Sequence, residues 1–219
     1  MAVYIIVAVI AYLIGSVNFS VLISKKMAGF DVREKGSGNA GTTNMLRSVG
    51  KKAAAITLIC DILKGVISIA IAIIVGSIVK NLDKELLLQI AGIAVVLGHT
   101  FPIFFGFKGG KGIAATSGLV ISLILFPKYC FMFTIFGMVT FGLVTKFSRY
   151  VSLGSITGII GFFIEFVIWG LVGWLPLNNN EFIEASIVVL LFVILGVARH
   201  SGNIKRLING TERKIGEKK

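Results

Sequence analysis

Long apolar stretches with few charges cover most of this chain, and they limit its fold more than any other feature. They occupy residues 3–23, 53–79, 86–105, 112–145, 151–175 and 182–198. A helix that crosses the hydrocarbon core of a bilayer needs about 20 apolar residues. Hydrophobic residues make up 56% of the chain and charged residues 15%, which disfavours both a disordered chain and an ordinary soluble enzyme. We therefore expect an all-α integral membrane protein in which residues 1–219 form a single polytopic domain.

The stretch 112–145 does not fit a single crossing. As one helix its 34 residues would extend about 51 Å, which is too long for one span and short for two. Pro127-Lys128 interrupts it, so we predict two helices joined by a tight turn there. The chain then has seven transmembrane helices.

The basic residues indicate how these helices are oriented. The chain has 22 Lys and Arg against 10 Asp and Glu, a net charge of +12. With seven spans, 18 of the 22 cations lie on one side, in loop 24–52, in the loops after the third and fifth spans, and in the tail from residue 199. That side is predicted to be cytoplasmic, which places the N-terminus outside and the C-terminus inside. In a soluble protein this excess would suggest nucleic acid, but here its position favours a membrane protein with no nucleic-acid partner.

The first basic loop carries a glycine-rich run that leads to an arginine: Gly36-Ser37-Gly38-Asn39-Ala40-Gly41-Thr42-Thr43-Asn44, and then Arg47. Glycine permits close backbone approach, and successive N–H groups in such a run bind anions. A guanidinium binds phosphate through two parallel hydrogen bonds. The alternative is a flexible polar loop, and composition alone does not decide between the two.

A second glycine-rich run lies directly before an apolar stretch: Gly98-His99-Thr100-Phe101-Pro102, and then Lys108-Gly109-Gly110-Lys111-Gly112. Backbone amides at a helix start, flanked by two lysines, are typical of a phosphate site. The run is not a Walker A loop, because position 112 is Gly where Ser or Thr is required. The alternative is a re-entrant turn with basic anchors.

Polar residues also follow the last span, in Arg199-His200-Ser201-Gly202-Asn203-Ile204-Lys205-Arg206 and in Glu212. A basic tail beside a span commonly attracts lipid headgroups, but His200 and Asn203 add little to that attraction. Within the second apolar stretch, Asp61 and Lys64 share a helix face. We favour a mutual ion pair there, although Lys64 could also reach towards bound phosphate.

These three motifs together resemble the bacterial integral-membrane glycerol-3-phosphate acyltransferases that use acyl phosphate, the PlsY family. The resemblance covers essentially the whole chain and includes Ser152-Leu153-Gly154-Ser155. It implies transfer of a fatty acyl group from acyl phosphate to glycerol 3-phosphate, giving lysophosphatidic acid and phosphate, the first acylation step of bacterial phospholipid synthesis. It also implies a multi-pass protein of the bacterial cell (inner) membrane with its active site on the cytoplasmic face.

The resemblance assigns roles to individual residues. Catalytic residues would be Ser37, Arg47, Lys111, His200 and Asn203. Substrate or phosphate would be bound by Gly36, Gly38, Asn39, Thr43, Asn44, Lys108, Gly109, Gly110 and Gly112, while Glu212 would be structural. We expect no metal and no cofactor. The partners would be acyl phosphate, glycerol 3-phosphate, membrane lipid and the enzyme that supplies acyl phosphate.

Two other classes of function fit parts of the sequence. A transporter or channel for a phosphorylated solute would use several spans and basic loops, but transporters usually show internal repeats, and we find none. A lipid-binding scaffold would not need His200, Asn203 and two glycine-rich loops.

Overall fold

The computed structural model describes residues 1–122, 130–175 and 177–217, and the regular structure among them is helical. The chain divides into two compact units, Met1–Ser122 and Leu123–Lys219. Each unit is described separately below.

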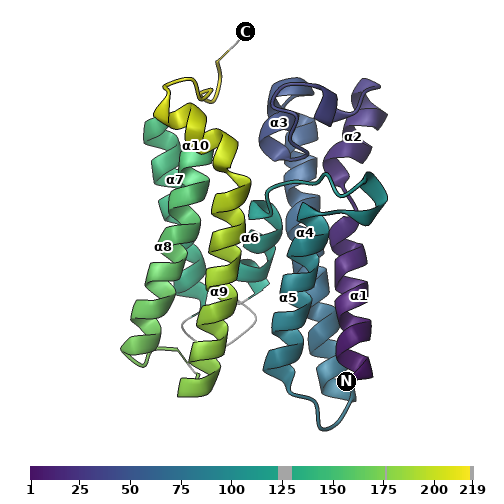
Figure 1. Ribbon diagram of the computed structural model, residues 1–219, viewed down its shortest axis with the longest axis vertical. Helices are drawn as coiled ribbons and strands as arrows, with labels where there is room; N and C mark the ends of the chain where they lie inside the picture. The colour runs from purple at the N-terminus through teal and green to yellow at the C-terminus, as the bar shows by residue number, and fades with distance from the viewer. Residues whose placement is uncertain (123–129, 176, 218–219) are drawn as a thin grey trace. The chain divides into compact units, whose positions relative to one another are not determined.

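The N-terminal unit consists of helices that pack lengthwise, with two short helices at one end (Figure 1). α1 packs along α5, and α4 packs against α5 and α6. The helices are α1 (Ala2–Ser16), α2 (Phe19–Ala28), α3 (Thr42–Ser48), α4 (Lys51–Ile78), α5 (Lys84–Thr100) and α6 (Ile113–Ser122), with 3₁₀ turns η1 (Val32–Glu34) and η2 (Ile103–Phe105).

The first apolar stretch contains a break between two helices. Val17 and Asn18 have extended backbone conformations between α1 and α2. The Asn18 side chain accepts a hydrogen bond from the N–H of Val21 at 3.2 Å, so it caps the start of α2. The break leaves main-chain carbonyl groups without helical partners inside the unit.

The C-terminal unit contains α7 (Cys130–Ser148), α8 (Val151–Leu171), α9 (Asn179–Arg199) and the short α10 (Ser201–Ile208). α8 packs against both α7 and α9, and α10 follows α9 at its C-terminal end (Figure 1). α9 begins with a capping box, in which the Asn178 side chain accepts from the Glu181 N–H and the Glu181 carboxylate accepts from the Asn178 N–H.

Among the residues that the structure describes, five helical segments are long and apolar enough to cross a membrane: Ala2–Ala28, Lys51–Ile78, Lys84–Phe105, Val151–Leu171 and Asn179–Arg199. These correspond to five of the predicted spans. The stretch 112–145 contributes the shorter α6 and α7, and the predicted turn at Pro127-Lys128 lies outside the described residues. The count of seven spans and the orientation of the termini stay predictions.

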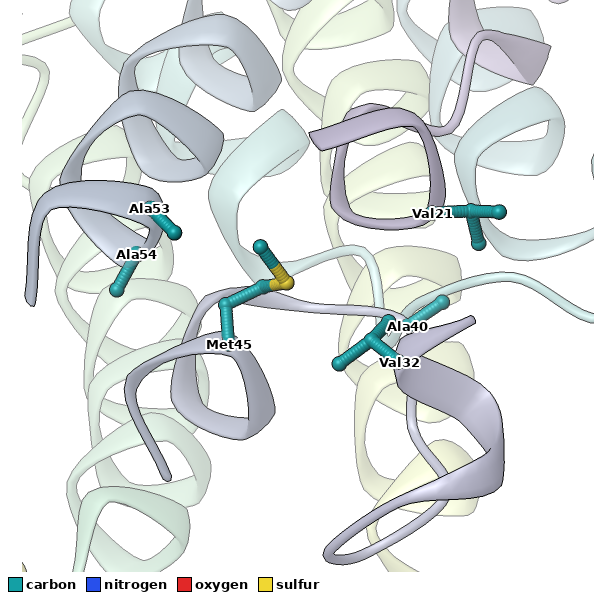
Figure 2. Close-up of a cluster of buried hydrophobic side chains, with 6 residues drawn as sticks. All are labelled: Val21, Val32, Ala40, Met45, Ala53 and Ala54. Carbon is teal, nitrogen blue, oxygen red and sulfur yellow. The ribbon is translucent and has the colours of Figure 1, made fainter. Parts of the chain in front are cut away.

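A small apolar core lies beneath the first glycine-rich loop. Val21, Val32, Ala40, Met45, Ala53 and Ala54 are buried together there (Figure 2). They come from α2, η1, the loop before α3, α3 itself and α4, so this cluster attaches the loop to the long helices.

Candidate active site

The first glycine-rich loop is folded around the side chain of Asn44. Both hydrogens of its amide nitrogen are used, because Nδ2 donates to the carbonyl oxygens of Val32 at 2.8 Å and Lys35 at 3.0 Å. Its Oδ1 accepts from the N–H of Ser37 at 2.9 Å. Asn44 is 1% exposed, so its amide orders the loop and does not face solvent as an open anion donor.

The loop presents its glycine and serine positions to solvent. Gly36 has φ +62°, and a Cβ placed there would collide with Asn44 Oδ1, so both conformation and space require glycine. Gly36, Ser37 and Gly38 are exposed, whereas Asn39 is partly buried. Residues Thr43 and Arg47 lie in α3, both partly buried.

The second glycine-rich loop folds back on the C-terminal end of α5. The N–H groups of Gly109 and Gly110 donate to the carbonyl oxygens of Thr100 and His99, at 3.2 and 3.1 Å. Gly112 then precedes α6, where the N–H of Thr116 donates to its carbonyl oxygen at 2.8 Å. The prediction that this run leads directly into an apolar helix is confirmed.

Within this second loop the two lysines differ in exposure. Lys108 is exposed and Lys111 is partly buried, whereas the three glycines, Gly109, Gly110 and Gly112, are buried. The loop therefore keeps its backbone packed against the protein while Lys108 is presented to solvent.

The two glycine-rich loops contact each other. Gly110 approaches the carbonyl oxygen of Ala40 so closely that a Cβ at Gly110 would lie 2.8 Å from it. Arg33 connects the loops as well, because its Nη1 donates to the carbonyl oxygens of Phe105 at 2.8 Å and Lys108 at 3.3 Å. Two motifs that lie far apart in the sequence thus form one surface of the N-terminal unit.

Arg33 is held in place by Asp31. The guanidinium donates from Nη2 to Asp31 Oδ2 at 2.8 Å and from Nε to Oδ1 at 3.0 Å. These hydrogen bonds hold the pKa of the Asp31 carboxyl below its ordinary value, against the opposing effect of burial. The same pairing raises the pKa of Arg33, so both groups stay charged.

The predicted pairing of Asp61 and Lys64 is confirmed, with Lys64 Nζ 3.0 Å from Asp61 Oδ1. Lys64 is 2% exposed and also donates to main-chain carbonyl groups at the α1–α2 break. The alternative that Lys64 reaches towards bound phosphate is therefore not what the structure shows.

The third motif lies in the C-terminal unit. His200 is 2% exposed, and its Nδ1 lies 2.7 Å from the carbonyl oxygen of Gly196. Because a carbonyl only accepts, Nδ1 carries the proton, and in the neutral ring Nε2 is an acceptor.

Glu212 gathers three polar side chains of this unit. Its carboxylate accepts from Ser152 Oγ at 2.9 Å, Asn203 Nδ2 at 2.8 Å and Arg206 Nε at 2.7 Å. Burial opposes ionisation, but these hydrogen bonds hold the pKa of Glu212 below its ordinary value. The ionised carboxylate thereby ties the residues after α10 to α8 and α10.

Known proteins resemble this chain over most of its length. The sequence model of the glycerol-3-phosphate acyltransferase family matches residues 5–210. The chain belongs to this family. A glycerol-3-phosphate acyltransferase of Clostridioides difficile is 42% identical over 99% of this chain and 97% of its own length. Another, from Shouchella clausii, is 42% identical over 94% of this chain and 93% of its own.

Two solved structures are also similar. Both are crystal structures of PlsY (YgiH), an integral membrane glycerol 3-phosphate acyltransferase, in its glycerol 3-phosphate and lysophosphatidic acid forms. The first has a TM-score of 0.79 and 34% identity, covering 97% of this chain and 96% of its own. The second has a TM-score of 0.77 and 33% identity, covering 97% and 95%. The chain is thus a multi-pass membrane acyltransferase that acylates glycerol 3-phosphate, a reaction of phospholipid synthesis.

In this acyltransferase the structure brings together the residues of the first two motifs in one unit and those of the third in the other. Some residues that hold the two loops in place were not predicted from the sequence. In the sequence, Arg33 is one of the several cations of loop 24–52, and nothing there indicates its pairing with Asp31. His99 belongs to the second motif, but the sequence assigned it no role and did not indicate that it lies beside Asp61.

Proposed function

We propose that this acyltransferase uses acyl phosphate as its donor and releases lysophosphatidic acid and inorganic phosphate. The observation that carries the proposal is the contact between the two glycine-rich loops. Lys108 and Lys111 lie in the second loop, and Arg47 lies in α3, which follows the first. Both proposed substrates carry a phosphate group, so two adjoining anion-binding loops suit them. The similar PlsY structures, which hold glycerol 3-phosphate in one form and lysophosphatidic acid in the other, support the acceptor and the product.

The catalytic residues in this proposal are Ser37, Arg47, Lys111, His200 and Asn203. Gly36, Gly38, Asn39, Thr43, Lys108 and Gly112 bind phosphate or substrate. Gly109 and Gly110, which the sequence motif assigned to the same role, instead shape the second loop, because their N–H groups already donate to the carbonyl oxygens of Thr100 and His99. Asn44 acts by ordering the first loop, since its two N–H donors are already bonded to carbonyl groups. Glu212 is structural, because it orders Asn203, Arg206 and Ser152. We expect neither a metal nor a cofactor in the reaction.

The acyl group of acyl phosphate is already activated, so we propose direct attack without an acyl-enzyme. The glycerol hydroxyl oxygen bonds to the acyl carbon, and the bond from that carbon to the phosphate oxygen breaks. Phosphate leaves with the bonding electrons, and the hydroxyl proton passes to a substrate phosphate oxygen or to His200 Nε2. Positioning of the reactants and cations beside the leaving group supply the acceleration.

The proposed setting is the bacterial inner membrane. Seven spans with the N-terminus outside would place all three motifs on the cytoplasmic face, where glycerol 3-phosphate is soluble and the acyl chain stays in lipid. Residues 1–219 would act as a single polytopic domain, and an enzyme that makes acyl phosphate would supply it as a partner.

The test is turnover by purified protein in lipid nanodiscs. Acyl phosphate, acyl-CoA and acyl carrier protein are each offered with glycerol 3-phosphate, and lysophosphatidic acid is measured by mass spectrometry. We expect product with acyl phosphate alone, and Lys111→Ala serves as the inactive control. A donor other than acyl phosphate, or a trapped acyl-Ser37 adduct, would contradict the proposal. Uptake of glycerol 3-phosphate into vesicles without turnover would favour a transporter.

A further inference from the structure

A buried chain of polar contacts runs from the break between α1 and α2 to the second glycine-rich loop. It starts at Lys64, whose ammonium has three donor hydrogens. Nζ donates to the carbonyl oxygens of Gly15 at 3.0 Å and Val17 at 3.2 Å, and it lies 3.0 Å from Asp61 Oδ1. All three hydrogens thus have partners, and the ammonium satisfies carbonyl groups that the helix break leaves without helical donors.

Asp61 connects this ammonium to α5. Its Oδ1 lies 3.5 Å from Nδ1 of His99, and Asp61 and His99 are 2% and 6% exposed. A carboxylate beside one ring nitrogen fixes the orientation of an imidazole, because the hydrogen bond made by one nitrogen sets the role of the other. The carboxylate therefore orients the His99 ring within the unit.

His99 in turn contacts the loop on two sides. Its carbonyl oxygen accepts from the N–H of Gly110 at 3.1 Å. Its Nε2 lies so close to Gly110 that a Cβ at this glycine would collide with it. The direction of the imidazole ring therefore determines where the backbone of Gly110 can lie, and Gly110 adjoins Lys111.

We propose that Lys64, Asp61 and His99 are positioning residues that set the conformation in which the Lys108–Gly112 loop binds phosphate. This inference rests on the proposed function, in which that loop holds a phosphate-bearing substrate. Stability alone does not account for the network, since buried ion pairs are often replaced by apolar side chains without loss of stability. The network of charged side chains adds a fixed orientation of the imidazole ring. This orientation matters because displacing a substrate-binding loop by about 1 Å can slow the reaction about 100-fold.

Two variants separate positioning from general stability. His99→Asn keeps a polar group near Asp61 but removes the ring edge beneath Gly110. The charge-balanced double variant Asp61→Leu/Lys64→Met removes the ion pair without leaving an unpaired charge. The matched control is Ser68→Ala, because Ser68 is 1% exposed in the same helix and its hydroxyl donates to the Lys64 carbonyl oxygen at 2.8 Å.

Each purified variant is examined by thermal unfolding, by steady-state kinetics with both substrates and by calorimetric titration with glycerol 3-phosphate. We expect the two test variants to weaken glycerol 3-phosphate binding or raise a KM by about tenfold or more, a larger effect than their loss of stability accounts for. Ser68→Ala should keep the wild-type KM and Kd even where its Tm falls.

Wild-type KM and Kd in folded His99→Asn would overturn the inference, as would equal effects in Ser68→Ala. If the double variant does not fold, His99→Asn alone decides, because it leaves the charge pair intact. A wild-type protein that binds glycerol 3-phosphate without turnover would overturn the proposed function instead, and the titration would still test the positioning role.

Discussion

The Glu212 carboxylate offers the most quantitative prediction about the C-terminal unit. It is 6% exposed and accepts hydrogen bonds from Ser152, Asn203 and Arg206. Glu212→Ala removes all three bonds and leaves the buried Asn203 amide and Ser152 hydroxyl without this acceptor. Hydrogen bonds to a charged group contribute about 1.5–3 kcal/mol each, while the partly exposed Arg206 adds about 0.5 kcal/mol because solvent screens it.

Because neighbouring contributions are not additive, we expect Glu212→Ala to destabilise the fold by about 3–5 kcal/mol. For a chain of this length that corresponds to a fall in Tm of roughly 10 °C. Glu212→Gln keeps an acceptor for Asn203 but places an amide beside the Arg206 donor, so it should cost about 1–2 kcal/mol. Thermal unfolding in detergent, followed by circular dichroism, measures both.

The pH dependence has a definite sign. The pKa of Glu212 is lower in the folded state than in the unfolded chain, so its contribution is complete above the unfolded value of about 4.3 and is lost as pH falls through the folded value. The difference in Tm between wild type and Glu212→Gln should therefore be full at neutral pH and shrink in acid. Glu184→Gln, which changes an exposed carboxylate in α9, is the control. An unchanged Tm in Glu212→Ala would show that these hydrogen bonds do not stabilise the fold.

Three further predictions concern the N-terminal unit. Arg47→Ala and Lys111→Ala should each lose activity by about 100-fold or more while the protein stays folded in detergent, because each removes a cation from the proposed phosphate site; near-normal turnover would exclude that residue from the site. Arg33→Met should raise KM for a phosphate-bearing substrate more than it lowers kcat, since it releases the carbonyl groups of Phe105 and Lys108; steady-state kinetics checks this, and an unchanged KM would contradict it. Gly98→Ala should destabilise the fold by about 1–3 kcal/mol, because its Cβ would collide with the Tyr12 carbonyl in α1; thermal unfolding measures the effect, and a wild-type Tm would argue against this close approach.

Hydropathy predicted much of the fold because membrane spans are long and almost uncharged. It did not predict the break at Val17 and Asn18, since a single capping asparagine inside an apolar run gives a weak signal. The break depends on Lys64, which lies 47 residues from Val17 in the sequence and donates to its carbonyl oxygen. No local pattern reveals such a partner.

The candidate site was likewise predicted only in part from the sequence. The motifs predicted which segments would bind phosphate, because glycine and cations cluster locally in the sequence. The role of Asn44 could not be predicted, since an asparagine in a glycine-rich loop can donate to an anion or to its own backbone. Arg33 was missed because its acceptor, the carbonyl of Phe105, is 72 residues away.

Phosphorus NMR can establish whether acyl phosphate is the donor at these loops. Purified protein in lipid nanodiscs is mixed with acyl phosphate and glycerol 3-phosphate, and all phosphorus signals are followed together by ³¹P NMR. We expect both substrate signals to fall at equal rates while lysophosphatidic acid and inorganic phosphate rise in equal amounts, and we expect Lys111→Ala to abolish the change. Phosphate release without lysophosphatidic acid, or no loss of acyl phosphate at all, would contradict it.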